Sequence, residues 1–161
     1  MTYNSKRKIT DMAVGAMLML AYALYANGKH EAEAGNLQFW AGRMLIFIGI
    51  GIAAIIVVQI LFHIAFAIGV SVKERAQTDE NVERIIRASM VEDERDKLID
   101  QKAARVGYAC VGIGFVAALV VWVLGGSAVT GLHILFGAFA GSTFAEGVVG
   151  VYLNERGVHN G

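Results

Sequence analysis

Long apolar runs dominate the chain, and they are separated by shorter polar segments. Four runs are almost free of charge, and they lie at about residues 10–26, 44–72, 106–124 and 132–153. A helix needs roughly 20 mainly apolar residues to cross a bilayer, so each run predicts a membrane-spanning helix. The first run is the shortest. A signal peptide cleaved near Ala21-Tyr22-Ala23 is the less favoured interpretation of it, because the apolar run continues to Tyr25.

The polar segment between the second and third runs holds most of the charge. Residues 73–105 carry 17 of the 28 Asp, Glu, Lys and Arg side chains. Thr78 suits the N-cap of a helix, and the segment contains neither glycine nor proline. We therefore predict an all-α fold, a four-span transmembrane helix bundle with a cytosolic helical insert between spans two and three. Two helices bending near residues 90–93 are expected within this insert.

Composition supports a single membrane domain, residues 1–161. The chain is 56% hydrophobic and 17% charged, with a mean hydropathy of +0.54. It has no proline and 19 glycines, as expected for uninterrupted helices that pack closely in lipid. The formal net charge is zero, so no direct nucleic-acid binding is predicted. A single cysteine, Cys110, offers no metal-site spacing.

The distribution of basic residues predicts the orientation. Twelve of the 14 Lys and Arg residues lie on one side if both termini and the insert share it. Because basic residues favour the cytosolic side, we expect a multi-pass protein of a prokaryotic cytoplasmic (inner) membrane with both termini cytosolic. The first external loop is predicted over residues 27–42, with Phe39 and Trp40 near the lipid interface. The second, over residues 125–131, has room only for a tight hairpin.

Ionisable groups inside a membrane usually mark function or a necessary partner. Glu146 is the leading case. An offset of 83 residues between the parallel second and fourth spans aligns Glu146 with His63, and also Ser142 with Gln59. A carboxylate beside an imidazole can exchange protons near neutral pH, which points to a proton or cation site. A structural polar clamp between helices is the alternative interpretation, and it is favoured by about two to one.

The fourth span also carries a face of small residues. Gly137 and Gly141 form a GxxxG pair, and Ala145 extends it. Such a face packs against another helix, within the chain or in a second copy, so a homo-oligomer is a candidate assembly.

No catalytic or cofactor motif is found. Ser142 and Thr143 lie near His63 and Glu146 only if the predicted alignment holds, and such hydroxyls usually bond to the helix backbone. His63 and His133 are expected at different depths, which disfavours a haem held by both. We therefore predict a protein that is not an enzyme, with no cofactor and no metal.

The segment Asp93-Glu94-Arg95-Asp96-Lys97, followed by Leu98-Ile99 and Lys102-Ala103, leads directly into the third span. It resembles a recurring Asp-Glu-Arg-Asp segment in an uncharacterised family of small prokaryotic integral membrane proteins. The resemblance covers about a third of the chain. It implies helical hairpins, a charged cytosolic segment and a regulatory protein partner. A charged face that is merely solvated is the plainer alternative, and it is favoured by about two to one.

These observations give two functional hypotheses. The first is a membrane-anchored interaction or regulatory protein, which binds a cytosolic protein through its charged insert, residues 93–97 above all. The second is a small oligomeric proton- or cation-coupled transporter or channel that uses Gln59, His63, Ser142 and Glu146. The lipid bilayer is a partner in both.

Overall fold

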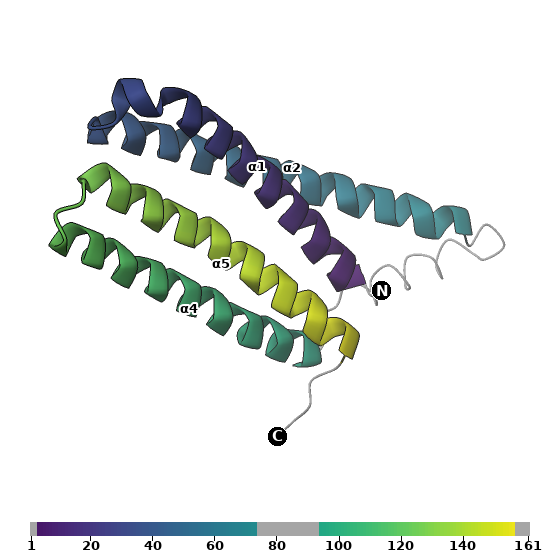
Figure 1. The fold of residues 1–161 in the computed structure, drawn as a ribbon. Coiled ribbons are helices and arrows are strands. Elements are labelled where there is room, and N and C mark those ends of the chain that lie inside the picture. Colours follow the sequence, from purple (N-terminus) through teal and green to yellow (C-terminus); the bar gives the residue numbers. More distant parts are fainter. Residues whose placement is uncertain (1–2, 74–93, 157–161) are drawn as a thin grey trace.

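The described part of the protein is entirely helical. A computed structural model describes residues 3–73 and 94–156. The helices are α1 (Tyr3–Glu33), α2 (Leu37–Lys73), α4 (Glu94–Val123) and α5 (Ala128–Arg156), shown in Figure 1. The prediction of an all-α fold with four long helices is confirmed for these residues. Of the predicted insert, residues 74–93 lie outside the described residues, and Asp93 is one of them.

All four helices are long and apolar enough to cross a membrane. Three of the four predicted spans fall within these helices, and the third, residues 106–124, passes the end of α4 at Val123 by one residue. Each helix is longer than its predicted span, and the charged residues 94–105 account for the extra length of α4. Large aliphatic side chains lie exposed along α2, including Ile52, Ile56 and Leu61. Exposed apolar surface of this extent is rare on soluble proteins, and lipid is its natural solvent.

The first connection is much shorter than the loop predicted over residues 27–42. Helix α1 continues to Glu33 and α2 begins at Leu37, so only three residues link them. Asn36 caps α2, since its Oδ1 accepts a hydrogen bond of 3.0 Å from the Phe39 amide. Trp40 is fully buried and donates from Nε1 to the Glu33 carbonyl at 2.8 Å. Trp40 therefore packs inside the bundle, because this hydrogen bond holds its ring against its neighbours; its predicted position near the lipid interface stays a prediction.

The second connection confirms the expected tight hairpin. The Gly126 amide donates to the Val121 carbonyl at 2.8 Å, and the Gly125 amide donates to the Trp122 carbonyl at 3.1 Å. This pair of bonds is a Schellman motif that ends α4. Gly125 has a φ of 82°, a conformation that side chains with a Cβ atom rarely adopt. Ser127 then caps α5 by accepting from the Thr130 amide at 3.0 Å.

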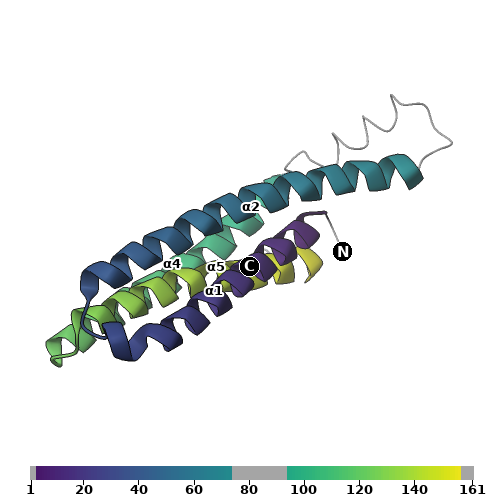
Figure 2. The same cartoon turned by 90° about the horizontal axis from the view of Figure 1, so that it is seen from above.

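The helices form two antiparallel hairpins that lie side by side (Figures 1 and 2). Helix α5 packs along α4 and also against α1, whereas α2 packs mainly on α1. The start of α1, the end of α2, the start of α4 and the end of α5 all lie at one end of the bundle. We call this the charged end. The two short connections lie at the opposite end.

Small residues allow the close approach of α4 and α5. The buried residues of α4 are Ile99, Ala103, Gly107, Gly114 and Ala118, which repeat at intervals of four and seven along one helix face. A side chain at Gly114 would collide with Ala138 on α5. Backbones pack closely in membranes through such small residues, so this face makes α4 and α5 the tightest pair in the bundle.

Aromatic rings fill the bundle toward the opposite end. Tyr22 on α1 packs against Phe136 of α5, with ring centroids 4.5 Å apart, and against Phe47 of α2 at 5.2 Å. Trp40 meets His133 edge to face at 4.7 Å. These contacts join α1, α2 and α5 at this end.

Candidate functional site

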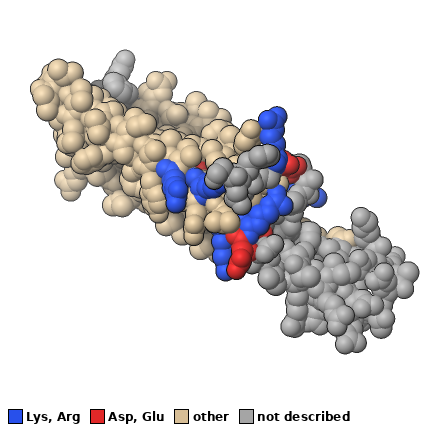
Figure 3. Space-filling view, turned by 90° about the horizontal axis from the view of Figure 1, so that it is seen from below, with Lys and Arg blue, Asp and Glu red and all other residues tan. Residues whose placement is uncertain are grey.

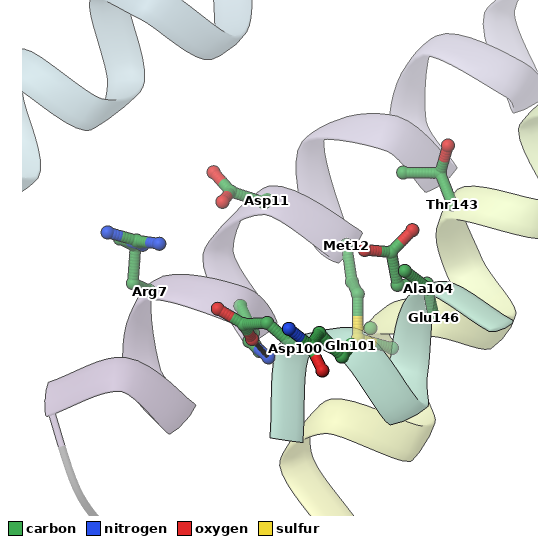
Figure 4. A pocket seen from close by; sticks show the side chains of 10 residues that line it. Arg7, Asp11, Met12, Asp100, Gln101, Ala104, Thr143 and Glu146 are labelled. Carbon is green, nitrogen blue, oxygen red and sulfur yellow. Dashed lines mark hydrogen bonds and ion pairs between the residues drawn. The ribbon is translucent and has the colours of Figure 1, made fainter. Parts of the chain in front are cut away.

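A polar pocket opens between α1, α4 and α5 near the charged end (Figure 4). Its volume is about 460 Å³, within the usual range for small-molecule sites. Two cations, three carboxylates and one amide are among the side chains that line it. We call it the polar pocket, and its lining residues are Arg7, Lys8, Asp11, Met12, Asp100, Gln101, Ala104, Thr143, Glu146 and Gly147.

One ion pair fixes the entrance side of this pocket. The Lys8 ammonium on α1 pairs with the Asp100 carboxylate on α4. Gly150 on α5 leaves room for the Lys8 side chain, since an added Cβ would collide with its end. The pair therefore joins three helices and neutralises two of the five charges. The other three charged side chains of the pocket are those of Arg7, Asp11 and Glu146.

Asp11 is only partly satisfied. Its Oδ2 accepts a hydrogen bond of 3.3 Å from Gln59 Nε2 on α2. Its Oδ1 is buried without a hydrogen-bond partner among the described residues, and the same holds for Arg7 Nε one turn earlier. Buried polar atoms are nearly always paired in folded proteins. The pocket therefore holds one unmet acceptor and one unmet donor in the ligand-free molecule.

Glu146 faces α4. A Cβ built on Gly107 would lie 3.2 Å from Glu146 Oε2, so the carboxylate occupies the space that this glycine leaves. We find no hydrogen bond or ion pair to this carboxylate within residues 3–73 and 94–156. Met12 reaches across from α1 and packs on Gly147 beside it. An anionic group therefore stands at the pocket wall, open to a cationic ligand.

The four residues predicted to form one cluster have other neighbours. Gln59 bonds to Asp11 on α1, and Ser142 donates from Oγ to the Phe139 carbonyl of its own helix at 2.7 Å. Ser142 is buried beside Gly107 of α4. His63 is half-buried on α2 and does not line the polar pocket. Gln59 and Ser142 thus make other contacts than the two predicted polar rungs between spans two and four, because Ser142 lies on the face of α5 that packs against α4.

An apolar groove of about 490 Å³ continues from the polar pocket along α1 and α5. The two spaces share Asp11, Met12 and Thr143. Gly137 and Gly141 line this groove, with nothing within 4 Å of a Cβ placed on Gly141. The predicted GxxxG pair therefore makes no close helix contact within the described chain. Ala145 is half-buried and lines neither space.

The predicted docking segment begins α4. Glu94, Arg95 and Lys97 are exposed, and Asp96 is half-buried. Arg95 Nη2 donates to the Asn154 carbonyl near the end of α5, over 3.4 Å. Figure 3 shows charged side chains gathered near this end, while the described residues on the far half of the same face show none.

Sequence reasoning missed Arg7, Lys8, Asp11 and Asp100 as site residues. Arg7 and Lys8 entered only through the count of basic residues that predicts the orientation, and Asp11 lies at the start of the first predicted span, where no role was assigned to it. One available signal is that Lys8 and Asp11 lie three apart, close to the same helix face. The spacing of Ala103, Gly107, Gly114 and Ala118 is a second signal, since it marks the face of α4 that approaches α5.

In the described part of the chain, no three His, Cys, Asp or Glu side chains come close enough to hold one metal ion. Within the described residues, the fold is a bundle of four helices, each long and apolar enough to span a membrane, with a polar pocket at one end. Comparison with known proteins finds no matching family model, no similar curated protein and no similar solved structure.

Proposed function

We propose that this chain is a membrane-anchored interaction protein of the prokaryotic cytoplasmic membrane, which binds a cytosolic protein through the charged start of α4. The observation that carries the proposal is that Glu94, Arg95 and Lys97 lie exposed on a helix whose next turns are firmly packed. Ile99 and Ala103 have no exposed surface. A charged surface on a fixed base loses little conformational entropy on binding.

The same helix gives the docking segment a direct connection to the bundle. Helix α4 runs without interruption from Glu94 to Val123, so its charged first turns continue into the apolar span. Arg95 contacts α5, and Asp100 pairs with α1. Exposed charges of both signs favour partner selection and fast association more than raw affinity. These features support regulation by docking, with the partner chosen by charge.

Affinity purification from native membranes in mild detergent, followed by mass spectrometry, tests this proposal. The test variant exchanges two exposed charges, Glu94→Lys with Lys97→Glu, and keeps the net charge. A matched control exchanges Glu155→Lys with Arg156→Glu, two exposed residues at the end of α5. We expect a cytosolic protein to be recovered with the wild type and the control but not with the test variant. Equal recovery with all three chains, or recovery of no partner, would sink the docking proposal.

A second candidate is a small proton- or cation-coupled transporter or channel, and the excess of carboxylates in the polar pocket favours it. The pocket wall carries Asp11, Asp100 and Glu146 against Arg7 and Lys8. Ionisable groups at membrane depth often mark ion pathways. Any oligomer would place several such pockets in one assembly.

Flux assays in proteoliposomes test the second candidate. Glu146→Gln should abolish cation-dependent flux, because it removes the unpaired charge and keeps the side-chain shape. Glu155→Gln makes the same change on the same helix but outside the polar pocket, and should leave the flux unchanged. Wild-type flux no greater than that of empty liposomes would remove this candidate.

A further inference from the structure

The polar pocket and the apolar groove form one continuous amphipathic space. They share three lining residues, Asp11, Met12 and Thr143, so the groove begins where the pocket ends. The groove wall is formed by small and aliphatic side chains of α1 and α5, from Gly15 to Ala23 and from Gly137 to Phe144. One end of the space therefore suits a charged group, and the rest suits a hydrocarbon chain.

Its length matches one leaflet of a bilayer. From Asp11 to Ala23 the groove follows twelve residues of α1, or about 18 Å at the rise of an α-helix. Half of the hydrocarbon core of a bilayer is about 15 Å. A single acyl chain in the leaflet at the charged end would therefore fill the groove, with its headgroup beside the polar pocket.

The charges of the pocket select the headgroup. Lys8 and Asp100 neutralise each other, which leaves Arg7 opposed by Asp11 and Glu146. The remaining net charge of minus one disfavours an anionic lipid. A zwitterionic headgroup fits, because its phosphate can pair with the guanidinium and its amine with a carboxylate.

The unpaired oxygen of Asp11 favours a primary ammonium over a quaternary one in the headgroup. Asp11 Oδ1 lacks a hydrogen-bond donor and Arg7 Nε lacks an acceptor among the described residues. A primary ammonium has three N–H donors, whereas a quaternary ammonium has none. Both atoms are covered in the ligand-free molecule, so a headgroup reaches them after a change of side-chain rotamer.

We propose that this space binds one phospholipid with a primary-amine zwitterionic headgroup, such as phosphatidylethanolamine, with the headgroup in the polar pocket and one acyl chain in the groove. The proposal is independent of the docking partner, because it concerns the bundle alone. It gives the α1–α5 groove an occupant, and it replaces a solute pathway through the polar pocket.

Native mass spectrometry of the full chain in detergent tests the proposal. Phosphatidylethanolamine, phosphatidylcholine and phosphatidylglycerol with identical acyl chains are added separately at equal mole fraction. We expect one bound phosphatidylethanolamine per chain, with at least about fivefold more complex than for either other lipid. Equal binding of the three lipids would show ordinary surrounding lipid only. Preferential binding of phosphatidylglycerol would show capture by basic residues, and either result overturns the proposal.

Two variants separate the headgroup from the chain. Asp11→Asn retains an oxygen for Gln59 but loses the charge, and should reduce the preference for phosphatidylethanolamine over phosphatidylcholine to about one. Gly141→Leu extends into the open groove and should lower the binding of phosphatidylethanolamine by about tenfold. Gly112→Leu is the matched control, because Gly112 on α4 also has open space around its Cβ position and lies outside the groove.

Unchanged helix content by circular dichroism and an unchanged elution volume show that each variant is folded. Binding of phosphatidylethanolamine that survives Gly141→Leu in a folded chain would place the lipid elsewhere and overturn the assignment. A purified chain without any protein partner is used throughout, so failure of the docking proposal leaves this result unaffected.

Discussion

At the scale of single residues, Asp11 carries the clearest difference between sequence and structure. From the sequence it is a charge at the very start of an apolar run, and Glu146 attracts attention because it lies deep within one. In the structure both line the same pocket. Their proximity depends on which helices become neighbours and at what height. Hydropathy predicts neither the neighbouring helices nor their relative height. It indicates only whether a helix is apolar enough for the membrane.

The hydrogen bond between Asp11 and Gln59 predicts a measurable coupling. Double-mutant cycles with Asp11→Ala and Gln59→Ala should give an interaction free energy of about 0.6 kcal/mol, and at most about 1.7 kcal/mol, as for other polar pairs between membrane helices. Unfolding in mixed micelles measures it. Gln38→Ala, at the far end of α2, should combine additively with Asp11→Ala. A coupling for the Asp11–Gln59 pair no larger than that control contradicts the observed contact.

Substitution of Gly125 should destabilise the protein through its backbone conformation and not through a steric clash. Nothing lies within 4 Å of a Cβ placed there, yet its φ is 82°. Gly125→Ala should therefore lower the free energy of unfolding by about 1 kcal/mol, the cost of a left-handed conformation. Gly112→Ala also adds a methyl group in open space, but in a regular helix, and should not destabilise the protein. Equal unfolding free energies for the two variants would show that Gly125 is not needed for this turn.

At the scale of elements, the sequence predicted which segments are helices better than which helices touch. Apolar runs of sufficient length specify the four spans, and Gly125 with Gly126 specifies the tight turn. The small residues of the fourth span were recognised, but their partner was left open as another helix of the chain or a second copy. The matching small face of α4 decides the pairing in favour of α4 with α5. Two complementary faces are needed for close packing, and only one was considered.

The contact between Gly114 and Ala138 allows a test of this pairing. Gly114→Ala should destabilise the bundle by about 1–3 kcal/mol, the usual range for overpacking, because the new methyl group meets Ala138. Ala138→Gly in the same chain should restore most of the loss, since it removes a methyl group from the same space. Unfolding in micelles compares the single and double variants. Absence of any rescue would mean that these positions do not face each other.

At the scale of the whole molecule, the charged end gathers every feature proposed to be functional. The docking segment, the polar pocket and the Lys8–Asp100 ion pair all lie near the start of α4. The opposite end has two short connections and an aromatic core, which together leave little room for a ligand. The proposal of a cytosolic protein partner therefore requires the charged end to face the cytosol, whereas the lipid proposal holds in either orientation.

Labelling of single cysteines in intact cells tests that orientation. With Cys110→Ala as the background, Gln38→Cys and Ala128→Cys stand at the opposite end, and Lys97→Cys stands at the charged end. The positive-inside rule places twelve of the 14 basic residues in the cytosol when the charged end faces inward. A membrane-impermeant maleimide should then label the first two variants in intact cells, and Lys97→Cys only after the membrane is opened. Labelling of Lys97→Cys in intact cells would place the docking segment outside, where no cytosolic protein reaches it. The docking proposal would then fail, whereas lipid binding would move to the outer leaflet and remain testable with the purified chain.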